Sequence, residues 1–203
     1  LGKMTKRVWQ RMLSGRRLDL LDPSPLDIEI EDIAHGLSFL TRWNGQTIGN
    51  HGYSVAEHSL LVEKIFTILN PNIETNWKMA ALLHDAAEYV IGDLISPVKN
   101  SIGQGYEILE EQLINAIYKR FGIIGPIPQI IKKKIKVADK NSAWLESVSI
   151  AGFKKNEANK IFGKPHGKIV GKIQVIPTSP MNAKSLFLRK HTELIKSMPL
   201  ATL

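Results

Sequence analysis

Residues 77–91 read Trp-Lys-Met-Ala-Ala-Leu-Leu-His-Asp-Ala-Ala-Glu-Tyr-Val-Ile, a stretch that is apolar almost all the way round. This pattern predicts a central buried helix. Beyond Lys78 its charged or imidazole side chains are His84, Asp85 and Glu88, and their spacing lets all three share one edge of the helix. A buried imidazole or carboxylate is costly unless it is paired or bound to a metal ion. The segment therefore predicts a polar site inside the core of a helical protein.

Two further segments each carry one ligand-type side chain on an inward face. In residues 54–69 the apolar positions repeat at helical spacing, and His58 falls in the same stripe. Ser54, with a glutamate three residues later, predicts a capping box at the start of this helix. In residues 126–150 a second inward stripe of apolar and small residues includes Asp139. Both segments are therefore expected to aim a ligand at the core.

His58, His84, Asp85 and Asp139 together form a candidate metal site with two imidazoles and two carboxylates. This set suits a catalytic divalent cation that keeps open positions for water and substrate. Because nitrogen and oxygen ligands accept several ions, the sequence leaves manganese, cobalt, iron, nickel, zinc and magnesium open. Two alternatives concern single residues: a lone His58 is typical of a satisfied core histidine, and Asp139 could pair with Lys136 or the lysine that follows it.

This ordered set resembles the HD-domain metal-dependent phosphohydrolases, whose ligands run His, His-Asp and Asp along the chain. Within that superfamily the chain is most similar to the bacterial 5′-deoxynucleotidase branch and related HD hydrolases. The matching pieces, which follow the order of the family, are Arg42-Trp43, Ser54-Val-Ala-Glu-His58-Ser, His84-Asp-Ala-Ala-Glu88, Gly92-Asp93-Leu-Ile-Ser-Pro-Val-Lys99 and Val137-Ala-Asp139.

The resemblance implies roles for residues beside the ligands. Glu88 matches a glutamate with a proton-transfer role, and a carboxyl in an apolar cleft can have the raised pKa that this role needs; a surface position near a helix end is the alternative. The guanidinium of Arg42 could clamp phosphate oxygens, or it could interact with a helix dipole. Trp43 matches a tryptophan that lines the sugar pocket and helps to reject ribonucleotides, and plain core packing is its alternative.

Further nucleotide contacts are expected after the second ligand segment. Residues 93–96 match a stretch that contacts the nucleotide in the family. Lys99, which follows this stretch, could reach phosphate or be solvated. These residues are Asp93, Leu94, Ile95, Ser96 and Lys99.

Together these features predict an enzyme, a metal-dependent phosphohydrolase that acts on a small nucleotide and most simply a 5′-(deoxy)nucleoside monophosphatase releasing inorganic phosphate. The expected catalytic residues are Glu88, Arg42 and Asp85, with the cation polarising the phosphoryl group, Arg42 orienting it and Glu88 handling the proton. Residues 44–53 differ from the deoxynucleotidase loop and are closer to that of many HD hydrolases of unsettled substrate. A (deoxy)nucleoside triphosphohydrolase and a non-catalytic HD domain that binds nucleotide or nucleic acid are the alternatives.

The composition is that of a globular protein without disulfides. The 203 residues are 43% hydrophobic and include no cysteine, so any metal must bind through nitrogen and oxygen. No apolar stretch is long enough to span a membrane, and the first residues do not resemble a signal peptide, so a cytoplasmic location is expected. The net charge of +8 arises in the second half, where a solvated lysine-rich face at residues 132–136 is favoured over nucleic-acid binding. A homodimer is an open expectation.

The expected architecture is an all-α, single-domain HD-type helical bundle over residues 1–203, with a catalytic core at 32–150 and a C-terminal extension at 151–203. Asp32 is expected to cap a helix, and a β-like run is expected at residues 168–176 inside a segment, 152–178, that the sequence does not otherwise place. Helices are predicted over residues 4–14, 32–43, 54–69, 77–91, 105–121, 126–150 and 180–197, with an extended lead-in at 18–27, a loop at 44–53 and an irregular stretch at 92–104.

Overall fold

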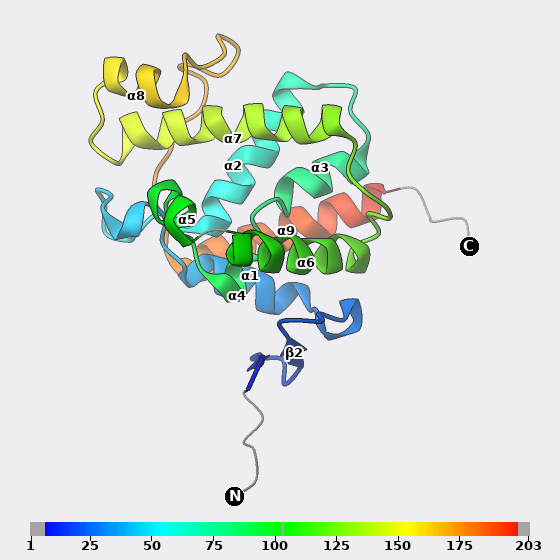
Figure 1. The fold of residues 1–203 in the computed structure, drawn as a ribbon. Coiled ribbons are helices and arrows are strands. Elements are labelled where there is room, and N and C mark those ends of the chain that lie inside the picture. The colour runs from blue at the N-terminus through cyan, green and yellow to red at the C-terminus, as the bar shows by residue number, and fades with distance from the viewer. Residues whose placement is uncertain (1–6, 103, 199–203) are drawn as a thin grey trace, which may run out of the picture.

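The computed structural model describes residues 7–102 and 104–198, with the side chains of Ser96, Pro97 and Asn100 outside that description. The predicted all-α class is confirmed, since the described strands form only a short hairpin and helices dominate the rest. Figure 1 shows α7 along one side of the bundle with α8 above it, and the N-terminal hairpin on the opposite side. Among the described residues, no helix combines the length and the apolar character that a membrane span requires.

The elements are, in chain order, β1 (Trp9–Arg11), β2 (Arg17–Asp19), the 3₁₀ turn η1 (Pro25–Asp27), α1 (Ile30–Phe39), the 3₁₀ turn η2 (Arg42–Gly45), α2 (Val55–Leu69), α3 (Thr75–Leu82), α4 (Glu88–Ile91), α5 (Ser96–Ile102), α6 (Gln104–Arg120), α7 (Gln129–Ser149), α8 (Lys155–Phe162) and α9 (Pro180–Ser197).

Helix α2 lies at the centre of the bundle and contacts α1, α3, α7 and α9. The hydroxyl of Ser54 accepts a hydrogen bond from the backbone N–H of Glu57, and the Glu57 carboxylate accepts one from the backbone N–H of Ser54. The predicted capping box is therefore confirmed. Val62 and Ile65 are fully buried on this helix, and so is His58. A ligand-type imidazole is thus enclosed near the start of a helix whose first turn is fixed by hydrogen bonds.

The segment that carries His84 and Asp85 departs from the prediction of one helix over 77–91. The structure has α3, then turns over residues 83–87, then α4. Backbone hydrogen bonds here join residues three apart, as from Glu88 N–H to the Asp85 carbonyl at 3.0 Å, which winds the chain more tightly than an α-helix. A segment that is apolar on every side predicts burial. Because it has no separate polar face, its sequence does not show where the helix gives way to a tighter turn.

Helix α4 is held against α1 by a close backbone approach. A Cβ atom at Gly36 would lie 2.9 Å from the Cβ and 3.1 Å from the carbonyl oxygen of Tyr89, so any side chain there would force the two helices apart. Glycine at this position therefore fixes the distance between α1 and the short helix that carries Glu88.

The N-terminal segment also departs from the prediction. In the described part of residues 4–14, β1 pairs with β2 in an antiparallel hairpin, and Trp9 stacks with Arg17 across it at 4.5 Å from the ring centroid. The predicted capping role of Asp32 is wrong, because its carboxylate accepts hydrogen bonds from the N–H and O–H of Ser14 at 3.0 and 2.5 Å. Asp32 therefore ties the hairpin to α1.

The later part of the chain agrees with the predictions at its helices and differs between them. The helix predicted from Pro180 to Ser197 is confirmed as α9, but the stretch 92–104 contains α5 where irregular structure was expected. The predicted β-like run at 168–176 is wrong, because these residues form turns and irregular chain and bury apolar side chains such as Ile169 without pairing in a sheet. The sequence did not indicate α8.

Candidate metal centre

The four predicted metal ligands come together between α2, α7 and the turn after α3. The Nε2 atom of His58 lies 3.4 Å from Asp85 Oδ2 and 3.5 Å from Asp139 Oδ1. The Nε2 atom of His84 lies 3.1 Å from the same Asp85 oxygen. One ligand atom from each of His58, His84 and Asp139 lies within 4.8 Å of the others. Three segments far apart in the sequence thus direct two imidazoles and two carboxylates at one point.

The hydrogen bonds of the two imidazoles fit a metal site. His58 Nδ1 faces Glu146 Oε1 at 2.6 Å, and His84 Nδ1 faces the carbonyl oxygen of Ala81 at 2.9 Å. Both acceptors favour a proton on Nδ1, so Nε2 is the nitrogen that remains to bind a metal ion. Both Nε2 atoms are buried and have no hydrogen-bond partner. Two unpartnered nitrogen atoms beside two carboxylates are the donor set that a divalent cation satisfies.

The charges at this point also suit a cation. Burial by itself would raise the pKa of Asp85, but the adjacent His84 and His58 hold that pKa well below its ordinary value. Burial likewise opposes ionisation of Asp139, while the His58 imidazole that faces it lowers its pKa. Both carboxylates are therefore ionised at neutral pH, as metal ligands must be.

Asp139 pairs with Lys136, the alternative that the sequence offered to metal ligation, and still faces the cluster. Its Oδ2 atom accepts a hydrogen bond from Lys136 Nζ at 2.7 Å, while Oδ1 faces His58. The lysine is on the exposed side of α7, with 68% of its side chain accessible, whereas the aspartate side chain is 18% accessible. Because different oxygen atoms take part, the surface pair leaves Oδ1 directed at the cluster.

Arg42 and Trp43 lie beside the cluster in a strained turn. Arg42 Nη1 is 3.9 Å from Asp85 Oδ2. Trp43 and Asn44 have φ angles of 57° and 50°, a left-handed conformation that costs a residue other than glycine on the order of 1–3 kcal/mol. The indole ring of Trp43 packs against Phe153 and Phe162 at centroid distances of 5.6 and 5.9 Å. Tertiary contacts thus hold this turn in place next to the metal ligands.

Glu146 is the residue of the site that the sequence reasoning missed. Its side chain is fully buried, and it accepts hydrogen bonds from Arg42 Nε and Trp43 Nε1, each at 3.0 Å, as well as contacting His58. Burial would raise the pKa of Glu146, but Arg42 and His58 hold that pKa at about 2. A signal was present, since Glu146 follows Asp139 by seven residues and so lies two turns further along the same face of α7.

Glu88 is buried at the start of α4, which is closer to the predicted acid/base position than to the surface alternative. Burial raises its pKa to about 8, with Asp85 and Asp93 adding to the rise and Lys99 opposing it. Its Oε1 atom accepts a hydrogen bond from Lys99 Nζ at 3.2 Å, while Oε2 has no partner. Lys99 also donates to Glu110 at 3.2 Å, so its ammonium group is engaged with carboxylates where phosphate contact was expected.

The remaining predicted substrate residues follow α4. Burial raises the pKa of Asp93, with Arg42 opposing and Asp85 adding to the rise, which places this carboxyl within electrostatic reach of the cluster. Leu94 is half-buried and Ile95 is 38% exposed. The side chain of Ser96 lies outside the described part of the structure. Contacts of these residues with a nucleotide stay a prediction.

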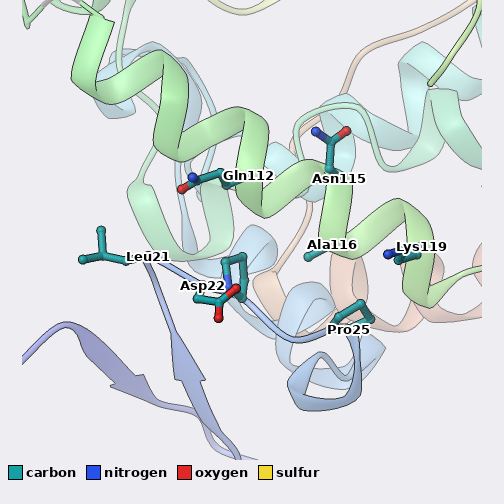
Figure 2. Close-up of a pocket in the computed structure, with 8 residues that line it drawn as sticks. Leu21, Asp22, Pro25, Gln112, Asn115, Ala116 and Lys119 are labelled. Atoms are coloured by element: carbon teal, nitrogen blue, oxygen red, sulfur yellow. The ribbon is translucent and has the colours of Figure 1, made fainter. Parts of the chain in front are cut away.

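A separate surface hollow lies between α6 and the segment that follows β2, as Figure 2 shows. It has a volume of about 320 Å³ and shares no residue with the cluster. Its charged side chains, Asp22 and Lys119, are both exposed, so the hollow offers no buried polar group to a ligand. The lining residues are Leu21, Asp22, Pro23, Pro25, Gln112, Asn115, Ala116 and Lys119.

Comparison with known proteins shows similarity to a protein family and to an individual protein. The model of a family described as 5′-deoxynucleotidase YfbR-like matches residues 32–193. An uncharacterized protein of Rhodobacter capsulatus is 55% identical over 193 residues, which amount to 95% of this chain and 98% of the relative. The family match spans most of α1, all of α2 and α7 and most of α9, and so includes all four predicted ligands.

Proposed function

The chain belongs to the YfbR-like 5′-deoxynucleotidase family, and from this premise we propose that His58, His84, Asp85 and Asp139 hold one divalent cation at which a 5′-deoxynucleoside monophosphate is hydrolysed. Membership of this family confirms the predicted enzyme class, a metal-dependent phosphohydrolase that acts on nucleotides. The assignment of individual residues, the sugar preference and the identity of the cation belong to the proposal.

The two unpartnered Nε2 atoms are the observation that carries the proposal. The ligands would be Nε2 of His58 and His84 with carboxylate oxygens of Asp85 and Asp139. When bound, the cation supplies Lewis-acid polarisation of the phosphoryl group and a lowered pKa for the attacking water. The donor set admits manganese, cobalt, iron, nickel, zinc or magnesium, and cellular availability would decide among them.

Arg42 would bind and orient the phosphate. Its Nε atom is taken by Glu146, and its Nη1 atom is directed to within 3.9 Å of Asp85 at the edge of the cluster. The guanidinium group therefore keeps N–H donors for phosphate oxygens while its position is fixed from behind. A positive charge held in a buried site stabilises the negative charge that builds up on the phosphoryl oxygens during transfer.

Glu88 would hold the proton that the reaction moves. A carboxyl whose pKa is about 8 can be protonated at neutral pH and can donate its proton from an oxygen atom to the leaving 5′ oxygen. The unpartnered Oε2 atom is the one available for this step, because Oε1 is engaged by Lys99. Lys99 would then orient the carboxyl.

Trp43 is proposed to line the sugar pocket and to discriminate deoxyribose from ribose. Its ring is fixed by the hydrogen bond to Glu146 and by packing against Phe153 and Phe162, so it can reject a 2′-hydroxyl by steric exclusion. Shape discrimination of this kind is worth about 1–3 kcal/mol, or about 10–200-fold. The altered loop at residues 44–53 lies next to Trp43 and would shape the pocket that receives the nucleoside.

The test is metal analysis followed by a phosphate-release screen on metal-stripped and metal-reloaded protein. We expect reloaded protein to release inorganic phosphate from 5′-deoxynucleoside monophosphates, and Asp139→Asn, which keeps the side-chain shape but removes a charge, to lose both the metal and the activity. Release of triphosphate from nucleoside triphosphates would favour the triphosphohydrolase alternative. Nucleotide binding without turnover in fully loaded protein would favour the non-catalytic domain.

A further inference from the structure

Glu146 divides its hydrogen bonds between its two carboxylate oxygens. Oε1 faces His58 Nδ1 at 2.6 Å and accepts from the Ser142 hydroxyl at 2.8 Å. Oε2 accepts from Arg42 Nε and Trp43 Nε1, both at 3.0 Å. The side chain is fully buried on α7, so water does not substitute for any of these partners. One oxygen thus contacts a proposed metal ligand and the other contacts the proposed substrate residues.

The Oε1 side sets the proton position on His58. A carboxylate oxygen only accepts hydrogen bonds, so it favours the form of the imidazole that carries a proton on Nδ1. The Nε2 atom of that form keeps its lone pair, and this is the buried, unpartnered atom that faces Asp85 and Asp139. Partners of this type orient metal-binding histidines, and their loss typically weakens metal affinity about 10–100-fold.

The Oε2 side fixes two neighbouring residues of a strained turn. Arg42 and Trp43 both donate to this one oxygen, and Trp43 has a left-handed backbone that is unfavourable for its residue type. A buried acceptor shared by two donors can hold such a turn in a single conformation. The guanidinium and the indole ring are thereby placed at a fixed distance from the metal ligands.

We propose that Glu146 is a positioning residue that builds the metal site and the substrate site together, with Oε1 keeping His58 Nε2 free for the cation and Oε2 fixing Arg42 and Trp43. The inference has a metal half, the effect of Oε1 on His58, and a substrate half, the effect of Oε2 on Arg42 and Trp43. Only the substrate half rests on the proposed function. Glu146 itself touches neither the cation nor the substrate in this arrangement, and it acts through the three residues that it holds.

The roles of the two oxygens can be tested separately with the substitution Glu146→Gln. The site of Oε2 must remain an acceptor, because Arg42 Nε and Trp43 Nε1 are both donors, so the amide oxygen of glutamine takes that place. Its NH₂ group then faces His58 Nδ1 and donates to it. This contact moves the imidazole proton to Nε2, the atom that has to be free for the cation. The variant should therefore damage the metal site and spare the substrate site.

The metal half is tested by titrating metal-stripped protein with Mn²⁺ and counting free Mn²⁺ by electron paramagnetic resonance. We expect Glu146→Gln to bind Mn²⁺ about 10–100-fold more weakly than the wild type. The matched control is Glu63→Gln, which changes another buried carboxylate, on the helix of His58, that contacts Thr67 and Lys190 instead. Wild-type affinity in Glu146→Gln, or an equal loss in Glu63→Gln, would overturn the proposal; circular dichroism of each variant reports that it is folded.

The substrate half is tested at Mn²⁺ concentrations that saturate each variant. Glu146→Gln should then keep the wild-type ratio of kcat/KM for deoxyribonucleotide over ribonucleotide, with KM changed less than about threefold. Trp43→Phe, which lacks the donor to Oε2, should change that ratio while its Mn²⁺ affinity stays at the wild-type value. A changed ratio in saturated Glu146→Gln would overturn the division between the two oxygens. If the wild type hydrolyses no nucleotide, the proposed function fails, and the Mn²⁺ titration still decides the role of Oε1.

Discussion

The substitution Glu88→Gln should make the metal-free protein more stable relative to the wild type as the pH rises. The carboxyl of Glu88 is 2% exposed, and burial, with repulsion from Asp85 and Asp93, raises its pKa from 4.5 to about 8 against the opposing charge of Lys99. In the unfolded chain the carboxyl has its ordinary pKa. Between pH 4.5 and 8 the folded protein therefore holds a proton that the unfolded chain has released.

The size of the effect follows from proton linkage. A folded state that binds one more proton than the unfolded state loses stability with rising pH at about 1.4 kcal/mol per pH unit. The contribution of Glu88 is therefore fully present below pH 4.5 and is lost as the pH rises through about 8. Between pH 5.5 and 7.5 the wild type should lose about 2.5 kcal/mol that Glu88→Gln, which does not titrate, retains.

The assay is urea unfolding of both proteins at pH 5.5, 6.5 and 7.5 in the presence of a chelator, because a bound cation would lower the pKa of Glu88. The quantity of interest is the change with pH in the difference between the two unfolding free energies, which removes any constant effect of the substitution. Glu110→Gln, which removes the other carboxylate that contacts Lys99, is the matched control and should run parallel to the wild type. Parallel curves for Glu88→Gln and the wild type would refute the raised pKa.

The other predictions concern catalysis and metal binding. Glu88→Gln should keep the metal and lose about 10²–10⁴ in kcat, measured by phosphate release from metal-loaded protein; undiminished turnover would remove Glu88 from the mechanism. Arg42→Ala should lower kcat/KM for deoxyribonucleotide and ribonucleotide alike, by about 10²–10³, and a loss confined to one sugar would contradict phosphate binding. Trp43→Ala should bring the two kcat/KM values closer together, whereas an unchanged ratio would show that Trp43 does not read the sugar. Adding the cation at about 100 times its Kd should stabilise the stripped protein by about 2.7 kcal/mol in urea unfolding, and no shift would argue against a metal site in the folded state.

The sequence predicted the elements whose signals are local. Helix α2 was indicated by the Ser54–Glu57 capping box and by apolar periodicity, and α9 by a proline at its first position. The predictions that were wrong concern segments whose structure depends on contacts with other parts of the chain. Strand β1 forms because β2 lies beside it, and the apolar run at 168–176 is buried one residue at a time without a strand partner. Local propensity does not contain either kind of information.

The candidate site shows the same division. The spacing of His84, Asp85 and Glu88 identified them as one polar edge, but the tightening of the chain at residues 83–87 left no mark in a uniformly apolar pattern. Glu146 was missed because its importance lies in partners that are far away in the sequence, 88 residues for His58 and 104 for Arg42. Helical periodicity predicts that Glu146 lies on the inward face of α7, but it does not predict which residues Glu146 contacts there.

The central claim is that two imidazoles and two carboxylates from three segments form one metal centre. The most direct test is a crystal grown with Mn²⁺ and measured for anomalous scattering. We expect one strong peak bonded to Nε2 of His58 and His84 and to carboxylate oxygens of Asp85 and Asp139, at distances of about 2.0–2.3 Å. A peak at another place in the molecule, or a cluster without a peak at a Mn²⁺ concentration that supports phosphate release, would contradict the account.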